Sequence, residues 1–346
     1  MHIYAIAEVV RCVFILAGAY ILYLIEYERL IVYGLIIFIS TLLLNLAYAI
    51  YVHKTLGTYR LSFHPDKQLI KPMLSFSGWD LYGNFCVTAR TQGINILLNM
   101  FFGVIVNAAS AIATQIQGVL LTFGSNVVLA FKPQLIQQYS KQNIAEMQKL
   151  AEESTRLSML LFGLVAIPVV IEMPYILHLW LSDVPAYTVS LTRITVLAGF
   201  FVFINSIINI LIQATGDIKA LSFISGSFIL MALPVAYIVL KIFNTPDSAY
   251  ILLMIFAAIL PAISFIILKR QIPKFNIKSY LFQGFCKALL GLFCSCLLIS
   301  MLVYAMDESL ARLIMVCIVS LAVCGVGVIK NIGGNNKFNT LCKIRK

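Results

Sequence analysis

Charged residues are scarce in this chain. They make up 11% of its 346 residues, whereas soluble globular domains carry about 25%. Hydrophobic residues account for 61%, and the mean hydropathy is +0.96. A chain with so few charges cannot cover a water-exposed surface, so the composition excludes a soluble globular domain. It predicts an all-α, polytopic integral membrane protein.

The residue patterns of metal, redox and nucleotide chemistry are also missing. The four histidines lie far apart, and the eight cysteines include no CxxC pair, so a zinc or dithiol site has no support. No GxxxxGK[ST] string occurs, which argues against ATP hydrolysis by this chain. No catalytic constellation is present either. We therefore expect no cofactor and no enzymatic activity.

Long apolar segments, by contrast, fill the sequence. A membrane-spanning helix needs about 20 mostly apolar residues, and the sequence predicts ten such spans. They cover residues 3–25, 29–52, 75–101, 106–131, 156–181, 188–214, 218–243, 247–268, 280–305 and 310–330. Residues 140–155 are predicted to form an amphipathic cytoplasmic helix that enters the fifth span and is only a solvated surface. Four prolines lie inside spans and are expected to bend them: Pro168, Pro174, Pro234 and Pro261.

Basic residues are distributed unevenly between the loops. Most of the 25 fall in alternate loops and in the C-terminal tail, whereas the opposite loops hold only Arg29, Lys241 and Arg312. The positive-inside rule then predicts a multi-pass protein with both termini in the cytoplasm; the family resemblance described below implies that the membrane is the inner (plasma) membrane. Because the basic residues are spread over loops, they favour contact with anionic membrane lipids. They do not form a nucleic-acid-binding patch.

The stretch from Ser75 to Tyr139 carries polar residues at membrane depth. It consists of two apolar segments joined by a predicted turn at Phe102-Gly103-Val104. Residues at helical spacing form one polar stripe on the first segment: Asp80, Asn84, Thr88, Thr91, Asn95 and Asn99. Small and polar residues share a face of the second: Asn107, Ala111, Thr114, Gly118 and Ser125. Polar groups are costly to place in hydrocarbon, so this hairpin is predicted to line a cavity or face other helices.

An ordered series of strings carries a family resemblance. The strings are FSGWDLYGN, TQGINILLNMFFG, VNAASAIATQIQG, KPQLIQQYS, LWLSDVPAYT, IQATGDIKA and LPVAYIVLK. In this order they resemble the oligosaccharide and polysaccharide flippases (Wzx type) of the multidrug/oligosaccharidyl-lipid/polysaccharide exporter superfamily. The resemblance extends over essentially the whole chain. The resemblance implies a MATE-like architecture, with two six-helix lobes around a cavity and often an extra C-terminal helix pair.

Mapped onto this chain, the resemblance implies an incomplete N-lobe. The expected parts are the last two N-lobe helices (1–54), a cytoplasmic linker (55–74), a six-helix C-lobe (75–268), the extra helix pair (278–330) and a basic cytoplasmic tail (331–346). The family's first four helices have no counterpart. Three explanations stay open: a fragment or misplaced start, a degenerate copy without activity, and a short form completed by an oligomer partner.

The function implied by the resemblance is export of undecaprenyl-pyrophosphate-linked oligosaccharide for surface polysaccharide or lipopolysaccharide biosynthesis. A family arginine thought to engage the pyrophosphate corresponds to Arg90, near the middle of its span. Arginine suits that role because its planar fork donates paired hydrogen bonds to phosphate. The alternative is that Arg90 forms an ion pair with Asp80 or with a neighbouring helix. A cation-coupled multidrug exporter of the same superfamily is the second functional hypothesis, with Asp80 as its coupling carboxylate.

The other candidate cavity residues each have a structural alternative. They are Asn95, Asn99, Gln117, Arg11, Asn205 and Asn209. Arg11 is three residues from Glu8, so a local ion pair competes with a cavity role. Asn205 and Asn209 share one helical face, where hydrogen bonds between helices compete with glycan contact. Glu172 and Arg193 lie near span ends and are expected to be interfacial or paired groups.

Overall fold

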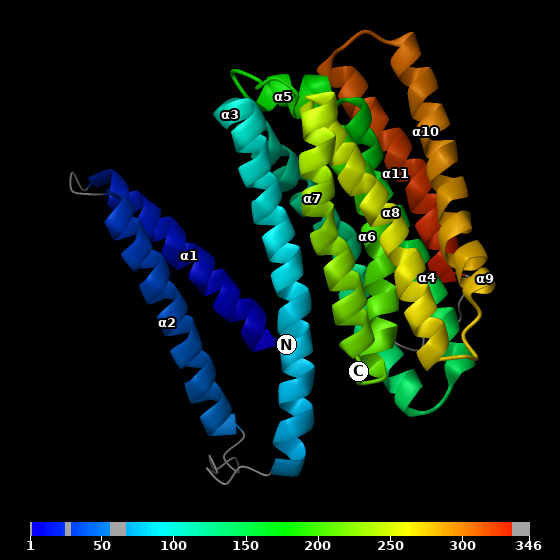
Figure 1. The fold of residues 1–346 in the computed structure, drawn as a ribbon. Coiled ribbons are helices and arrows are strands. Elements are labelled where there is room, and N and C mark those ends of the chain that lie inside the picture. The colour runs from blue at the N-terminus through cyan, green and yellow to red at the C-terminus, as the bar shows by residue number, and fades with distance from the viewer. Residues whose placement is uncertain (1, 25–28, 56–66, 334–346) are drawn as a thin grey trace. The chain divides into compact units, whose positions relative to one another are not determined.

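The computed structural model describes residues 2–24, 29–55 and 67–333 (Figure 1). Every regular element among these residues is helical, which confirms the predicted all-α class. Residues 56–66 and 334–346, which include most of the predicted linker and of the basic tail, lie outside the described residues. The chain forms two compact units, Met1–Ile70 and Lys71–Lys346, which are described separately below.

The first unit is a helical hairpin of α1 (His2–Leu24) and α2 (Arg29–Thr55). Gly18 allows the two helices to approach closely, because a Cβ atom there would lie 2.6 Å from Ile36 Cγ2. Ser40 is buried, and its hydroxyl donates a hydrogen bond of 2.8 Å to the Ile37 carbonyl oxygen within α2. Small residues and internally satisfied hydroxyls at a helix contact are typical of membrane hairpins.

The second unit begins with the long element α3 (Lys67–Ser140), which Gly103 divides into two arms. Gly103 has φ 76° and ψ −166°, a backbone conformation that is essentially restricted to glycine. The predicted turn at residues 102–104 is therefore confirmed, and Figure 1 shows the chain reversing at this point. We call the part before Gly103 the first arm and the part after it the second arm. Ile94 on the first arm and Val106 on the second belong to one buried cluster.

Shorter helices complete the second unit. They are α4 (Ile144–Ile171), α5 (Met173–Trp180), α6 (Thr188–Ala214), the π-helix η1 (Leu221–Ser225), α7 (Gly226–Phe243), α8 (Pro246–Gln271), α9 (Ile277–Tyr280), the π-helix η2 (Leu281–Cys286), α10 (Lys287–Ala305) and α11 (Leu310–Gly333). Helix α6 packs along α8 and α4, while α10 and α11 pack on α4. The main core therefore lies around α4 and α6, with Phe162 and Phe203 fully buried in it.

Eight described helical stretches are long and apolar enough to cross a membrane. The stretch Ile70–Ser140 counts as one of them, although Gly103 interrupts it. The protein is thus a multi-pass membrane protein. The total of ten spans and the division into MATE-like lobes stay predictions.

The segment before the predicted fifth span agrees only in part with the sequence-based expectation. Residues 144–155 do form a helix that enters this span, as the first three turns of α4, which begins after the N-cap Asn143, but they are not merely a solvated surface. Met147 and Ala151 are fully buried there, because the chain after α8 packs on them; Thr155 Oγ1 lies 2.6 Å from the hydroxyl of Tyr280 on α9. The predicted fifth span, residues 156–181, is interrupted at Glu172. A new helix, α5, begins there with Pro174 in its first turn.

Candidate functional site

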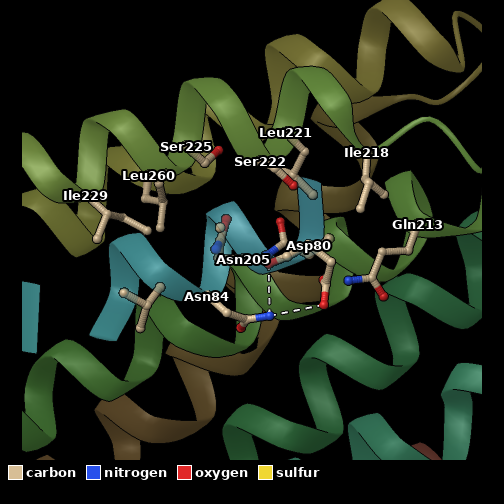
Figure 2. A pocket seen from close by; sticks show the side chains of 14 residues that line it. Asp80, Asn84, Asn205, Gln213, Ile218, Leu221, Ser222, Ser225, Ile229 and Leu260 are labelled. Atoms are coloured by element: carbon tan, nitrogen blue, oxygen red, sulfur yellow. Dashed lines mark hydrogen bonds between the residues drawn. The ribbon is translucent and has the colours of Figure 1, made fainter. Parts of the chain in front are cut away.

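A polar pocket of about 160 Å³ lies between the first arm of α3, α6 and the start of α7. Half of its lining residues carry amides, hydroxyls or a carboxylate, so we call it the amide pocket (Figure 2). Its polar lining residues are Asp80, Asn84, Asn205, Asn209, Gln213, Ser222 and Ser225. The pocket therefore brings together three of the predicted site residues: Asp80, Asn205 and Asn209.

Helical spacing explains how the sequence builds two walls of this pocket. Asp80 and Asn84 are one turn apart on α3, and Asn84 Nδ2 donates to the Asp80 backbone oxygen (3.0 Å) and to Asp80 Oδ2 (3.1 Å). Asn205, Asn209 and Gln213 recur every four residues and so share one face of α6. Figure 2 shows the Gln213 side chain extending toward Asp80. The single carboxylate is therefore surrounded by neutral amides.

The third wall is the π-helix η1, whose serines line the pocket. Ser225 Oγ on η1 and Asn209 Oδ1 on α6 are buried and make no hydrogen bond with any described residue. Buried polar atoms are nearly always hydrogen-bonded in native proteins, and π-helical turns occur frequently at functional sites. Both residues line the amide pocket, and these two atoms are its buried polar atoms without a partner among the described residues.

A second pocket of about 130 Å³ adjoins the first and contains Arg90. The two pockets share Asn205, Ile229 and Leu260. Apart from Asn205 and Ser206, the side chains around Arg90 are apolar. Ser264 Oγ on α8 donates a 2.8 Å hydrogen bond to Asn205 Oδ1 and so fixes the side chain that both pockets share.

Arg90 is half-buried, and its one hydrogen bond is a long contact of 3.5 Å from Nη2 to Thr91 Oγ1. Within the described ranges, no carboxylate lies within 4.0 Å of its guanidinium. Asp80 is ten residues earlier in the same arm, which is about 15 Å along a helix. The alternative of an Arg90–Asp80 ion pair is therefore wrong. Within the described part of the chain, the guanidinium is thus left without a counterion.

The polar groups continue along α6 from its end toward its middle. Gln213 lies in the last turn of α6, and Asn209 and Asn205 follow one and two turns further in. Asn205 lines the Arg90 pocket as well. Polar side chains thus extend about 12 Å along α6 from its end, and the innermost of them, Asn205, lines the same pocket as Arg90.

Only some residues of the polar stripe on the first arm line these pockets. Most of its members are exposed, namely Asp80, Asn84, Thr88, Thr91 and Asn99, whereas Asn95 is half-buried. Asp80 and Asn84 also line the amide pocket, so this pocket opens onto the stripe. On the second arm Ala111, Thr114, Gly118 and Ser125 are exposed and Asn107 is half-buried. Most side chains of this polar face are therefore not covered by other described residues of the second unit.

Four predicted site residues lie away from the two pockets. Asn95 and Asn99 stand further along the stripe. Gln117 Nε2 donates a 2.7 Å hydrogen bond to the Thr195 carbonyl oxygen, which joins the second arm to α6. Arg11 belongs to the first unit, where its Nε lies 3.0 Å from Glu8 Oε2; the predicted local pair is confirmed. Arg11 also lines an apolar groove of about 390 Å³ between α1 and α2.

Ser222, Ser225 and Gly83 are pocket residues that the sequence analysis did not identify. The two serines are three residues apart, a spacing visible in the sequence, but the π-helical turn that carries them is not. Gly83 faces Ser222, whose Oγ would lie 3.6 Å from a Cβ at position 83. Among the described residues, no group of three or more His, Cys, Asp or Glu side chains is placed to hold a metal ion.

Searches among models of protein families, curated proteins and solved structures found no match to this chain.

Proposed function

We propose that this protein moves undecaprenyl-pyrophosphate-linked oligosaccharide across the inner membrane for surface polysaccharide or lipopolysaccharide biosynthesis. One observation carries the proposal: Arg90 has no carboxylate partner among the described residues and lines a pocket joined to the amide pocket. An arginine at the centre of a spanning helix costs at least ~2.5–3.5 kcal/mol on insertion scales. An anionic ligand would offset that cost.

The two pockets offer different chemistry to different parts of such a substrate. The Arg90 fork matches phosphate oxygens, while the amide pocket offers neutral donors and acceptors suited to hydroxyl groups, which both donate and accept. Each pocket has room for a single group, not for a whole glycan. The pyrophosphate would contact Arg90, a sugar hydroxyl would contact Asn209 and Ser225, and the lipid tail would stay in the bilayer.

Movement would follow the alternating-access scheme, in which helices rock around a fixed site near the bilayer midplane. The amide pocket is built partly from η1, and a π-helical turn interrupts the regular α-helical hydrogen bonding. Pro261 lies in α8 and Pro234 in α7, and each removes one amide donor from its helix. These irregular helices surround the pockets and are where we expect bending during transport. An ion or proton gradient would supply the energy.

The test is binding of radiolabelled undecaprenyl-pyrophosphate oligosaccharide to the reconstituted protein. We expect Arg90→Ala to weaken binding about tenfold or more, because a charge-assisted hydrogen bond is worth ~1.5–3 kcal/mol. Arg90→Lys should recover only part of it, since an ammonium group cannot reproduce the bidentate fork. Arg90→Ala should accumulate normally, because losing an unpaired charge favours insertion. Arg90→Lys should accumulate like the wild type, because it keeps the positive charge.

Lys132→Gln is the matched control, since it removes a half-buried cation from the other arm of α3. This control should bind like the wild type. Unchanged binding by Arg90→Ala would reject the proposed role. Low abundance of Arg90→Ala would also count against the proposal, because it would assign Arg90 a structural role.

The second candidate function is a cation-coupled multidrug exporter, and the environment of Asp80 favours it. Its carboxylate lies in a pocket with amide groups from Asn205, Asn209 and Gln213, and such oxygens are ligands for hard cations. The same assay separates the two functions. An exporter of this kind would fail to bind the lipid-linked glycan, and Asp80→Asn would abolish its cation-driven drug efflux.

A further inference from the structure

A second kind of cavity lies at the other end of α6, where α6 and α8 both begin. It has a volume of about 580 Å³, within the range of small-molecule sites. Helix α6 starts at Thr188 and α8 at Pro246, and both are span-length helices. Their first turns therefore belong at the level of lipid headgroups. We call this cavity the interface pocket.

Two opposite charges line the interface pocket without pairing with each other. Arg193 donates from Nε to the Val170 carbonyl oxygen (2.9 Å) and from Nη2 to that of Ile171 (3.3 Å). Its Nη1 group makes no hydrogen bond within the described part of the chain. Asp247 Oδ1 accepts a 2.6 Å hydrogen bond from Ser190 Oγ. No oxygen of Asp247 comes within 4.0 Å of a guanidinium nitrogen of Arg193.

These contacts fix both charged groups in place. The two carbonyls at the end of α4 orient the guanidinium, and Ser190 orients the carboxylate through one of its oxygens. The other oxygen of Asp247 has no hydrogen-bond donor among the described residues. Backbone carbonyls thus hold the Arg193 cation, and a hydroxyl group holds the Asp247 anion. Among the described residues, Arg193 Nη1 is left as a free donor and one Asp247 oxygen as a free acceptor for a ligand.

The remaining lining residues suit a lipid more than a free solute. Ile194 and Ile251 provide an apolar wall, and Tyr187 is 47% exposed at the start of α6. Tyr187 has φ 69°, a left-handed conformation that costs a non-glycine residue about 1–3 kcal/mol. Tyrosine is enriched where one end of a side chain meets apolar groups and the other meets water.

We propose that the interface pocket binds the phosphoethanolamine headgroup of a membrane phospholipid. The phosphate contacts Arg193, the primary ammonium donates to Asp247, and the acyl chains lie along Ile194 and Ile251. This lipid is favoured over others by charge complementarity. A phosphatidylglycerol headgroup offers no cation to Asp247, and the trimethylammonium of phosphatidylcholine has no hydrogen to donate. The proposal is independent of the substrate of transport.

The experiment is lipid titration of the purified full chain in detergent, with thermal unfolding and native mass spectrometry as the two measurements. We expect phosphatidylethanolamine to bind about tenfold more tightly than phosphatidylcholine or phosphatidylglycerol, because a hydrogen bond to a charged group is gained. Asp247→Asn should remove that preference while keeping an acceptor for Ser190. Asp183→Asn is the matched control, because Asp183 is exposed and does not line the pocket.

Four results would overturn the proposal. They are equal binding of all three lipids, tightest binding of phosphatidylglycerol, loss of preference in Asp183→Asn, and competition by soluble phosphoethanolamine as strong as that by the lipid. The last result would identify a soluble ligand in place of a phospholipid. Arg193→Lys should weaken binding of all three lipids, but because Arg193 also holds the end of α4, Asp247→Asn is the deciding variant.

Discussion

A buried ion pair stands out among the few charged residues of the second unit. Arg312 Nη2 on α11 lies 2.8 Å from Glu172 Oε2, with side-chain exposures of 9% and 1%. Arg312 also donates from Nη1 to the Met306 carbonyl oxygen at 3.1 Å. Glu172 is the residue at which α4 gives way to α5. The pair therefore attaches α11 to the break between these two helices.

Breaking this pair from one side should be costly. Arg312→Met leaves an uncompensated buried carboxylate, so we expect the free energy of unfolding to fall by about 3 kcal/mol. The double variant Glu172→Gln/Arg312→Met should recover most of that loss, because neither charge remains. The measurement is a double-mutant cycle on unfolding in mixed micelles.

Glu308→Gln serves as the control for this cycle. Glu308 is also near Arg312, at 3.6 Å, but its side chain is 64% exposed. Exposed ion pairs contribute ~0–1 kcal/mol, so this variant should be nearly neutral. A loss as large as that of Arg312→Met would show that burial does not set the strength of the contact.

Sequence reading reaches some of these residue contacts and not others. The Glu8–Arg11 pair follows from a spacing of three residues on one helix. The Glu172–Arg312 pair joins residues 140 positions apart, and no local rule gives its partner. The depth of Arg90 in its span was predictable, because it follows from the position of Arg90 within one apolar segment. Its lack of a carboxylate partner was not, because that depends on how α3, α6 and α8 pack.

At the scale of elements, the α3 hairpin depends on one backbone conformation. Gly103 has φ 76°, and a Cβ atom at this position would meet nothing within 4 Å. Strain from the backbone, not crowding, should therefore decide the effect of a substitution. We expect Gly103→Ala to lower the free energy of unfolding by about 1–3 kcal/mol.

Gly118 in the second arm is the matched control. It too has open space around a Cβ, but it lies inside a regular helix, where alanine is preferred to glycine by ~0.5–1 kcal/mol. Gly118→Ala should thus be neutral or stabilising in the same unfolding assay. Equal losses from both substitutions would mean that the turn conformation is not the cause.

The elements were predictable where local signals mark them. Gly103 marks the hairpin turn, and Pro174 marks the start of α5. The helix over residues 144–155 was predicted, but its burial was not, because its packing partners come from the chain near Tyr280, about 125 residues later. The π-helical geometry of η1, which positions Ser222 and Ser225 in the amide pocket, has no signature in the sequence.

At the scale of the whole molecule, the composition predicts the class of protein, a multi-pass membrane protein. The two ends of the second unit differ in charge. Figure 1 shows α5 and the α10–α11 connection at one end of this unit and α9 at the other. Basic residues surround α9, namely Lys269, Arg270, Lys274 and Lys278, whereas Asp183 and Asp307 lie at the α5 end. Loop charges could be read from the sequence, but the neighbours of each helix could not, because apolar helices offer many equivalent partners.

The last prediction concerns the orientation of this unit. Four positions in connecting segments alternate between its ends: Lys141, Asp183, Lys274 and Asp307. One spanning element, α4, separates the first two; α6, α7 and α8 separate the second from the third; and α10 separates the last two. If each of these helices crosses the membrane once, the four positions must alternate between the two sides. The positive-inside rule further places Lys141 and Lys274 in the cytoplasm.

Single cysteines at these four positions, in a background without the eight native cysteines, test both statements. A membrane-impermeant maleimide added to intact cells should label Asp183→Cys and Asp307→Cys, and should reach Lys141→Cys and Lys274→Cys only after permeabilisation. The reverse pattern would keep the spans but invert the orientation, and the loop charges would then not control insertion. Labelling of Lys274→Cys and Asp307→Cys from the same side would show that α10 does not cross, and the set of spans in the second unit would have to be redrawn.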